Sequence, residues 1–405
     1  MITLTTYAEA KEAFRSRSLR QALYDEGARL MSGVIVNLHG DEHIARRRLE
    51  NRLFSPETFA CYERDRIPMI IDDVLRQAVA DGHGELLLLA QRTMTTLSVD
   101  VAGIDRVTGI DDELRRFFEI MSCLARASTV VHTTGDKQAI IDAGDRALTG
   151  FESEFFEPSK ARRIDLLERV RRGELDEAAL PRDVLTTLLR NQDRLDLPAE
   201  TLLREVAYFP WVGAHSTAAQ LVHALHHMFE WMDVHPADGA ALIGNDVMRQ
   251  RFVHESMRLH PASPVALRIA TTDIELRSGR VLPAGATVVI SVHDANRDSA
   301  VFGVRADAFD PYREYPDGVA PWGLSFGHGS HACLGRELAG GVEAVGVAAV
   351  GVAAGGEHLF GSVALMAGEL LRRGARPDPE DPATLDSNTT RIVWGRYPVT
   401  FDQRR

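Results

Sequence analysis

Apolar positions recur at helical spacing through most of the first half of the chain. Residues 71–80 and 86–101 carry them three and four apart, which predicts two helices, although threonines weaken the pattern at the centre of the second. A longer helix is predicted over residues 198–231. Because Pro210 lies inside it and lacks a backbone N–H, we expect a kink there.

The pattern changes after Arg268. Residues 274–276, 281–282 and 287–291 are short apolar runs separated by turn-forming serine, glycine and proline, which predicts short strands joined by tight turns. No stretch inside the chain has the composition of a linker. The expected architecture is one domain over residues 1–405, mainly α with small β-sheets.

Composition narrows the class of protein. The chain has 405 residues, 45% of them hydrophobic, which is enough for a large core. Its formal net charge of −12 argues against nucleic acid as the main partner and favours a small-molecule substrate. No run approaches the roughly 18 apolar residues of a membrane span. Charges also interrupt residues 1–15, where a secretory signal would be apolar, so we expect no membrane contact and a cytoplasmic location.

The three cysteines, Cys61, Cys123 and Cys333, lie far apart and form no CxxC pair. This spacing argues against both a disulfide framework and a zinc site. Cys333 stands in the glycine-rich stretch 326–335, FGHGSHACLG. Such a loop can turn sharply and approach a flat ligand, and a thiolate held in it could ligate heme iron. The plainer alternative is a glycine-rich loop with an ordinary buried cysteine.

This stretch resembles the heme-binding signature of the cytochrome P450 family, FxxGxHxCxG, matched at Phe326, Gly329, His331, Cys333 and Gly335. The resemblance implies a P450-like fold, with heme b (iron protoporphyrin IX) between a long distal helix and the proximal cysteine loop. It implies Cys333 as the iron ligand, Phe326 packed near it and His331 on a heme propionate. Gly335 belongs to the same heme-binding turn.

A second match is Glu255 and Arg258, which fit the ExxR motif of the family. Residues three apart share a helix face, so the carboxylate and the guanidinium can pair and hold a third partner. Arg313 is similar to that third partner. We expect this triad to support the fold and not the chemistry; an isolated ExxR is more commonly a surface ion pair.

Burying two heme propionates requires cations. His43 and Arg47 lie four apart, similar to the HxxxR of an early helix in the family, and Arg268 falls where the family places another propionate arginine. With His331 they would form a cage. The alternative for His43 and Arg47 is a solvated basic face, because further arginines adjoin them.

The resemblance runs from about residue 40 to the end, including residues 295–298 and 397–399, with two departures outside the site. His43 stands unusually early, so we expect part of the usual N-terminal helix and sheet edge to be missing or rebuilt. The alanine- and glycine-rich run 340–356 is poor helix material, so we expect an irregular or extended element without chemistry.

A third departure lies on the predicted distal helix. The family pattern (A/G)-G-x-(D/E)-T falls on residues 212–216, where the acid has become His215 and the alcohol Ser216, followed by Thr217. The predicted roles are heme contact for Gly213 and proton delivery for His215, Ser216 and Thr217, with a pH dependence near the usual histidine pKa of about 6.5, subject to burial. His215 could instead contact substrate or simply pack.

The resemblance implies a monooxygenase that uses molecular oxygen to hydroxylate, epoxidise or couple a small organic molecule, plausibly in secondary metabolism. Residues 265–267 are expected to contact that substrate. Since the chain has no flavin or nicotinamide fingerprint, an NAD(P)H-fed ferredoxin and ferredoxin reductase would supply electrons. Arg46, Arg48 and Arg52 could present a basic patch to an acidic ferredoxin, or form a solvated face.

Two alternatives remain open at the level of the sequence. The absent acid favours a peroxide-using or non-oxygenating heme-thiolate enzyme. A protein of another class, a heme-binding sensor or accessory domain, would carry the same cysteine loop without turnover.

Overall fold

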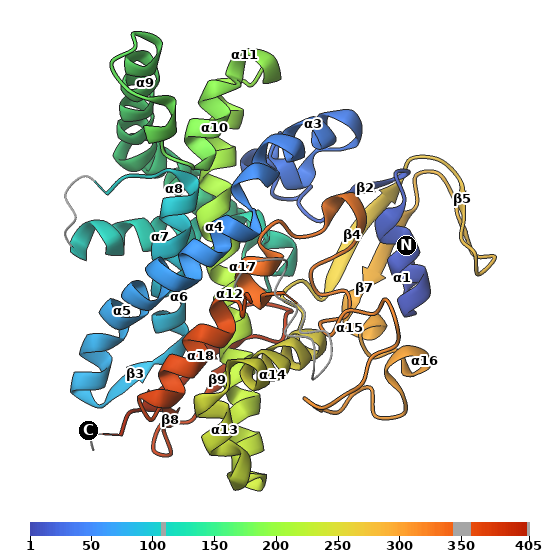
Figure 1. Cartoon of the computed structure of the whole chain (residues 1–405). Helices are drawn as coiled ribbons and strands as arrows, with labels where there is room; N and C mark the ends of the chain where they lie inside the picture. Colours follow the sequence, from blue (N-terminus) through green and yellow to red (C-terminus); the bar gives the residue numbers. More distant parts are fainter. Residues whose placement is uncertain (107–110, 343–357, 403–405) are drawn as a thin grey trace.

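One long helix, α12 (Ala199–Val234), runs through the middle of the molecule (Figure 1). The computed structural model describes residues 1–106, 111–342 and 358–402. Helices gather on one side of α12, and a small sheet with the N-terminus lies on the other. The predicted fold class, mainly α with small β-sheets, is confirmed. Helix α12 continues past Pro210 without a break.

The other helices are mostly short. Those before α12 are α1 (Tyr7–Arg15), α2 (Ala28–Met31), α3 (Gly40–Glu50), α4 (Pro56–Cys61), α5 (Ile67–Asp81), α6 (Leu86–Ala102), α7 (Asp111–Ser128), α8 (Lys137–Phe151), α9 (Glu157–Arg171), α10 (Val184–Arg190) and α11 (Gln192–Leu195). Those after it are α13 (Gly239–Gly244), α14 (Asp246–Leu259), α15 (Val292–Ala295), α16 (Ser299–Phe302), α17 (Arg336–Gly340) and α18 (Ser362–Arg372).

The largest sheet described has the strand order β1-β7-β4-β2, made of β1 (Ile2–Leu4), β7 (Thr287–Ser291), β4 (Val265–Ala270) and β2 (Leu19–Gln21). β1 pairs with β7 in parallel, and the other two pairings are antiparallel. The smaller sheets pair β5 (Ile274–Glu275) with β6 (Val281–Leu282), β10 (Trp394–Arg396) with β9 (Thr384–Leu385), and β11 (Pro398–Thr400) with both β3 (His83–Glu85) and β8 (Arg376–Pro377).

The predicted elements lie where the sequence pattern put them. Residues 71–80 fall inside α5, residues 86–101 fall inside α6, and the three apolar runs after Arg268 contain β5, β6 and β7. Both ends of helix α6 are capped. The Glu85 carboxylate accepts hydrogen bonds from the first-turn N–H groups of Leu87 and Leu88, and Gly103 ends the helix with φ +84°.

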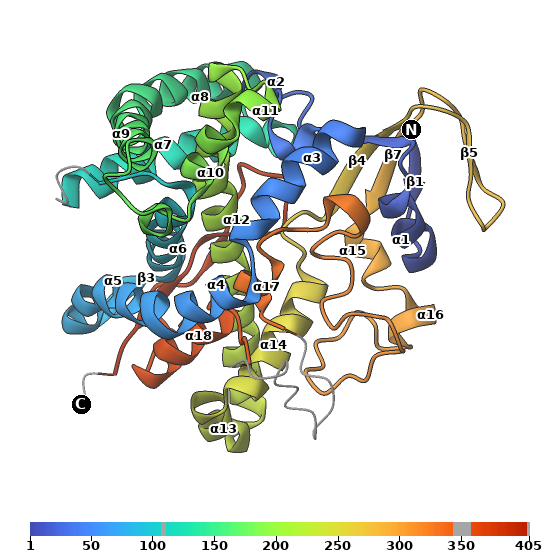
Figure 2. The ribbon, with the colours of Figure 1, turned by 45° about the horizontal axis from the view of Figure 1, so that its top comes forward.

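Two apolar clusters of the core meet along α12. Its first half, from Leu202 to Trp211, packs with α7, α8 and α10. Its second half, from Ala214 to Met232, packs with α5, α6, α14 and α18. A third cluster fills the space between α1 and the four-stranded sheet. Figure 2 shows α17 in front of the middle of α12, with α3 above it. The junction of the two clusters therefore faces the part of the fold that carries the cysteine loop.

Candidate active site

The loop around Cys333 is a tight turn held by its own backbone. The Cys333 N–H donates to the Phe326 carbonyl oxygen at 2.8 Å, and a short 3-10 turn, Gly329–His331, lies between these residues. Gly329 has φ +71°, and a Cβ added there would lie 2.8 Å from the Phe14 carbonyl oxygen. Only glycine fits this approach. The turn presents the thiol just before α17.

The Cys333 side chain is accessible to solvent, yet protein surrounds it closely. Burial raises the pKa of the thiol, while a hydrogen bond from the Gly335 N–H and the charges of Arg47 and Arg336 oppose that shift. The net direction is upward, so the free group is a thiol at neutral pH. A metal ion bound to the sulfur would reverse this preference and hold the thiolate.

Four basic side chains converge beside this loop. His43 and Arg47 come from α3, Arg268 from β4 and His331 from the loop itself. The rings of His43 and His331 stack with their centroids 3.9 Å apart, and the Arg47 guanidinium donates to the Ala332 carbonyl oxygen. The structure thus brings together all four residues that the sequence proposed for the heme propionates.

These side chains lower one another's proton affinity. Burial, followed by the positive charges of His43, Arg268 and Arg47, lowers the pKa of His331 to about 3. Burial and Arg47 lower the pKa of His43 to about 4, and burial lowers that of Arg268 to about 10. His43 Nε2 is buried without a hydrogen-bond partner among the described residues. A ligand with several negative oxygens fits such a cluster.

Behind the loop, Glu255, Arg258 and Arg313 form a buried ion-paired group. Arg258 contacts both carboxylate oxygens of Glu255 at 2.7 Å, and Arg313 Nε donates to Glu255 Oε1 at 3.2 Å. The Tyr315 hydroxyl also donates to Glu255, at 3.1 Å. Arg258 is fully buried. The three residues that the sequence grouped do pair, and they lie in the core and not on the surface.

Asn296 links this group to the cysteine loop, a connection that spacing alone did not reveal. Its carbonyl oxygen accepts from Arg258 at 2.6 Å, while its side chain accepts from the Leu324 N–H at 2.7 Å and donates to Ser325 Oγ at 2.9 Å. Gly323, with φ +60°, leaves room for this side chain. Asn296 therefore ties α14 to the segment that leads into Phe326.

On α12, His215 lies against α6 and α7. Its Nδ1 is 3.4 Å from Gln91 Nε2, and its ring lies 6.4 Å from that of Phe118. Its Nε2 is buried and has no hydrogen-bond partner in the described chain. Burial, with a smaller contribution from Arg391, lowers the pKa of His215 to about 4. The expected titration near 6.5 is therefore wrong: the ring is neutral at physiological pH.

The two alcohols after His215 are less free than the sequence suggested. The Ser216 hydroxyl donates to the Val212 carbonyl oxygen of its own helix at 2.6 Å, which leaves it only as an acceptor in this rotamer. Thr217 is buried. Gly213 is partly accessible, and a Cβ on it would lie 3.0 Å from Ser98 Oγ. Its contact with a cofactor remains a prediction.

The predicted basic patch on α3 is wrong in one member. Arg46 is buried, and its guanidinium pairs with Glu205 of α12 at 2.8 Å. Arg48 and Arg52 are exposed. Glu50 is buried close to this pair, and neither of its carboxylate oxygens has a hydrogen-bond partner among the described residues. Local spacing gave no signal for Glu205, because its partner Arg46 lies on another helix.

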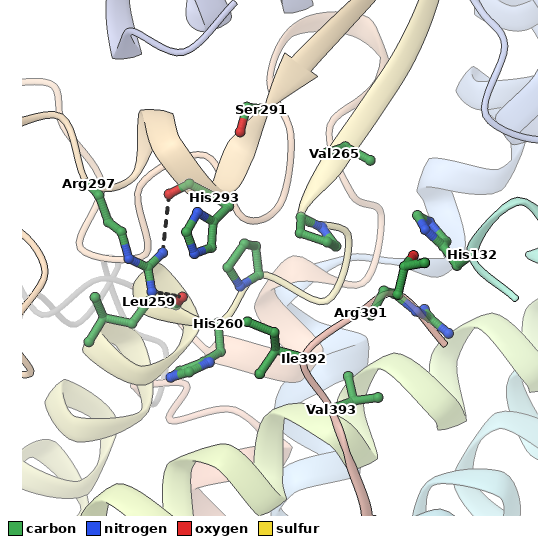
Figure 3. Close-up of a pocket in the computed structure, with 13 residues that line it drawn as sticks. His132, Leu259, His260, Val265, Ser291, His293, Arg297, Arg391, Ile392 and Val393 are labelled. Carbon is green, nitrogen blue, oxygen red and sulfur yellow. Dashed lines mark hydrogen bonds between the residues drawn. The ribbon is translucent and has the colours of Figure 1, made fainter. Parts of the chain in front are cut away.

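A cavity of about 380 Å³ lies between the end of α14, the start of β4 and the segment that precedes β10 (Figure 3). Val265, predicted to contact substrate, lines it together with Ile392. Arg297 and His293 lie at one end, and Arg391 and His132 lie at the other. Sequence reasoning missed the charged residues of this cavity.

Comparison with known proteins finds similarity to one family. A family model described as Cytochrome P450 matches residues 248–342, which contain the ion-paired group and the cysteine loop. Nocardicin C N-oxygenase of Nocardia uniformis subsp. tsuyamanensis is 29% identical over 76% of this chain and 69% of its own length. Cyclooctat-9-en-7-ol 5-monooxygenase of Streptomyces melanosporofaciens is 24% identical, over 78% and 71%. Both relatives and the matched segment thus make this chain similar to cytochrome P450 proteins.

Solved structures of similar fold agree with this architecture. The crystal structure of CalO2 superposes with a TM-score of 0.72 over 99% of this chain and 90% of that one, at 21% identity. HmtN, described as a post-tailoring hydroxylase in himastatin biosynthesis, gives 0.69 over the same shares, at 20% identity. The predicted P450-like fold is confirmed.

Two further expectations concern membrane-spanning helices and the alanine- and glycine-rich run. Within the described ranges no helix of the chain is long and apolar enough to cross a membrane. The alanine- and glycine-rich run that we expected to be irregular, residues 340–356, lies outside the described residues from 343 onward. Its first residue, Gly340, ends α17.

Proposed function

We propose that this P450 binds heme b and uses molecular oxygen to hydroxylate, epoxidise or couple a small organic molecule. The observation that supports this most is the convergence of four basic side chains beside an accessible cysteine in a tight glycine turn. Because two relatives are named for oxygenation reactions on elaborate small molecules, we place the activity in secondary metabolism.

In this proposal Cys333 ligates the iron, and His43, Arg47, Arg268 and His331 bind the propionates. The Gly335 N–H donates to the Cys333 sulfur and partly neutralises its charge. A thiolate-ligated heme supplies the electron donation that favours cleavage of the O–O bond. The stacked rings of His43 and His331 are uncharged, so they would contribute hydrogen bonds while the arginines contribute charge.

Sustained turnover tests the oxygenase assignment. Purified holoprotein, NAD(P)H, a surrogate ferredoxin and its reductase would be incubated with a compound panel under isotopically labelled oxygen gas. We expect labelled oxygen in the product of a hydroxylation or epoxidation and none after heat treatment. A coupling reaction would instead consume oxygen without labelling the product. Absence of product and of substrate-stimulated NAD(P)H consumption across the panel would contradict the assignment.

We further propose that His215 takes part in proton delivery, with Ser216 and Thr217 behind it. The buried Nε2 without a partner is the atom available for such a role, and Gln91 fixes the ring through Nδ1. Because the pKa of His215 is about 4, its protonated form becomes common only in acid. Proton delivery should therefore improve as the pH falls toward 4, and not around 6.5.

Four variants separate a relay from a packing role. Product formed per NAD(P)H consumed would be compared for His215→Ala, His215→Asp and Ser216→Ala, with His235→Ala, an exposed histidine just after α12, as the control. A relay predicts low coupling in His215→Ala and partial recovery in His215→Asp. If binding weakens in both His215 variants, the residue contacts substrate. Wild-type coupling, binding and pH profile throughout would leave it as packing.

A second candidate function is oxidation with peroxide, which needs no proton delivery to bound oxygen. The observation that favours it is the absence of an ionised acid at the His215 position, together with a Ser216 hydroxyl that donates to its own helix. Turnover with hydrogen peroxide alone, faster than turnover with NAD(P)H and the ferredoxin chain, would select this candidate.

For the electron donor we propose a ferredoxin that docks near α3. Arg48 at the end of α3 and Arg52 in the turn that follows it are exposed cations; Arg46 is excluded because it is buried. Charge steering should weaken with salt. Reversal of both charges, Arg48→Glu with Arg52→Glu, should slow reduction by ferredoxin at low salt, and the same reversal at Arg171 and Arg172 on the far end of α9 serves as the control. Equal reduction rates in the two double variants would refute the docking site.

A further inference from the structure

The cavity in Figure 3 has an apolar middle and a charged group at each end. Val265 of β4 and Ile392 line the middle. Its volume of about 380 Å³ lies within the usual range for small-molecule sites, roughly 300–1,000 Å³. Such a site binds the body of a ligand by apolar contact and orients it by a few polar groups. The two charged ends therefore decide what it can recognise.

At the first end of the cavity, Arg297 already has hydrogen-bond and ion-pair partners in the protein. Arg297 donates to the carbonyl oxygens of His293 at 3.1 Å and Leu259 at 2.6 Å, and its Nε lies 3.4 Å from Asp307 Oδ1. These contacts hold α15 against the end of α14. Arg297 is thus part of the wall and not a free recognition group.

At the second end the cation is not satisfied. Arg391 has no side-chain hydrogen bond or ion pair with the described part of the chain, and its Nε is buried without a partner. Burial lowers the pKa of this guanidinium, and the charges of Tyr24 and Asp386 oppose the shift. A guanidinium stays protonated even so. Arg391 is half-buried, and a partly desolvated cation without a counter-ion carries a cost that an anion arriving with a ligand would offset.

Backbone pairing fixes His132 next to this cation. The Thr390 N–H donates to the His132 carbonyl oxygen at 2.8 Å, and Thr133 and Thr389 form an isolated antiparallel bridge. His132 is buried, and burial followed by the charge of Arg391 lowers its pKa to about 4. A neutral imidazole beside a guanidinium can add one hydrogen bond to an anion without adding charge.

Arg391 also faces the distal helix. Its charge contributes to the lowered pKa of His215, and together with Arg268 it opposes the rise that burial causes in the pKa of Tyr24. The second end of the cavity therefore lies within electrostatic range of His215 on α12, and Tyr24 lies within range of both Arg391 and Arg268.

We propose that the substrate of this P450 is an organic acid whose carboxylate binds Arg391 and His132 while its apolar body lies along Val265 and Ile392. This inference rests on the proposed function and narrows its substrate class. A planar guanidinium matches a carboxylate through two parallel hydrogen bonds, which an amide or alcohol of the same shape cannot replace at full strength. A heme propionate is a second source of carboxylate, and the experiment distinguishes the two.

The test uses matched ligands on the holoprotein. 4-Phenylbutanoate and decanoate would be titrated by calorimetry against 4-phenylbutanamide and decan-1-ol. In the wild-type protein we expect each acid to bind at least tenfold more tightly than its neutral partner, the least that a charge-assisted pair provides. Arg391→Gln should bring the ratio close to one without weakening the neutral ligands, and Arg391→Lys should keep part of it. Arg396→Gln, which removes an exposed arginine paired with Asp381, should behave as wild type.

Three results would overturn the inference. One is equal binding of acid and neutral partner by the wild-type protein, and another is failure of both acids to bind at millimolar concentration. The third is an Arg391→Gln protein that keeps the acid preference but loses heme, which would assign the guanidinium to a propionate. Because calorimetry needs no turnover, each of these outcomes is distinct from a failure of the oxygenase proposal, which would show as intact binding without product.

Discussion

Replacement of Arg258 by methionine should be among the most destabilising single changes in the chain. The guanidinium is fully buried and donates to both oxygens of Glu255 at 2.7 Å, to the Asn296 carbonyl at 2.6 Å and to the Ala306 carbonyl at 2.7 Å. Methionine has a similar length and no donor. Glu255 would retain Arg313, but the two carbonyl oxygens would have no donor in its place.

The expected loss follows from these contacts. Removing one partner of a buried ion pair costs about 3–5 kcal/mol, and each buried carbonyl left without a donor costs roughly 1–3 kcal/mol, part of which is already inside the first figure. We therefore expect a decrease of about 3–5 kcal/mol in the free energy of unfolding. Total stabilities are about 5–15 kcal/mol, so the variant should be marginal. Heme retention should fall too, since Asn296 connects Arg258 to the cysteine loop.

Urea denaturation followed by far-UV circular dichroism measures this loss. Arg258→Lys keeps the charge but cannot reproduce the planar fork, so its loss should be intermediate. Arg76→Met is the surface control, because Arg76 forms exposed ion pairs with Asp72 and Asp73, and it should cost less than about 1 kcal/mol. A midpoint for Arg258→Met that matches the Arg76→Met midpoint would refute the assignment of Arg258 as a core element.

Two further predictions concern buried groups near the site. Burial raises the pKa of Glu205 to about 7 and that of Glu50 well above its usual range. Since the unfolded value is about 4.3, each protonated acid contributes stability that is lost as the pH rises through its raised pKa, which for Glu205 is about 7. Glu50→Gln should therefore gain stability over wild type between pH 5 and pH 8 in urea denaturation; a pH-independent difference would contradict this. Gly323→Ala should release heme and lower the melting temperature, because its Cβ would lie 2.3 Å from Asn296 Oδ1, whereas Gly318→Ala, with a similar positive φ and open space, should show only the smaller backbone penalty; equal effects would rule out the clash.

Much of the fold and part of the site could be predicted because their signals are local. Helical spacing located α5, α6 and α12, and turn residues located the strands after Arg268. The loop of Cys333 combines a reactive side chain with glycines that only a close backbone approach requires. Each of these features depends on residues that lie within about ten or twenty positions of one another, so a single sequence is enough to recognise it.

The errors came from contacts between distant segments. Arg46 resembled part of a basic surface because its neighbours are arginines. It is in fact buried and paired with Glu205, which lies 159 residues further along the chain. The pKa of His215 depends on burial between α6, α7 and α12 and on Arg391, none of which the sequence around residue 215 reveals. The missing partner of the Arg391 guanidinium could not be predicted either, because His132 and most of the cavity lining come from distant parts of the chain.

The central claim is that Cys333 ligates heme iron as a thiolate. The most direct test is the absorption spectrum of the reduced protein with carbon monoxide, measured for wild type and for Cys333→Ser, with Cys61→Ser and Cys123→Ser as controls. We predict a strongly red-shifted band in the wild type and both controls, and its loss in Cys333→Ser at unchanged secondary structure by circular dichroism. Persistence of that band in Cys333→Ser would contradict the claim. Loss of the band in Cys61→Ser or Cys123→Ser, while Cys333→Ser keeps it, would also contradict it.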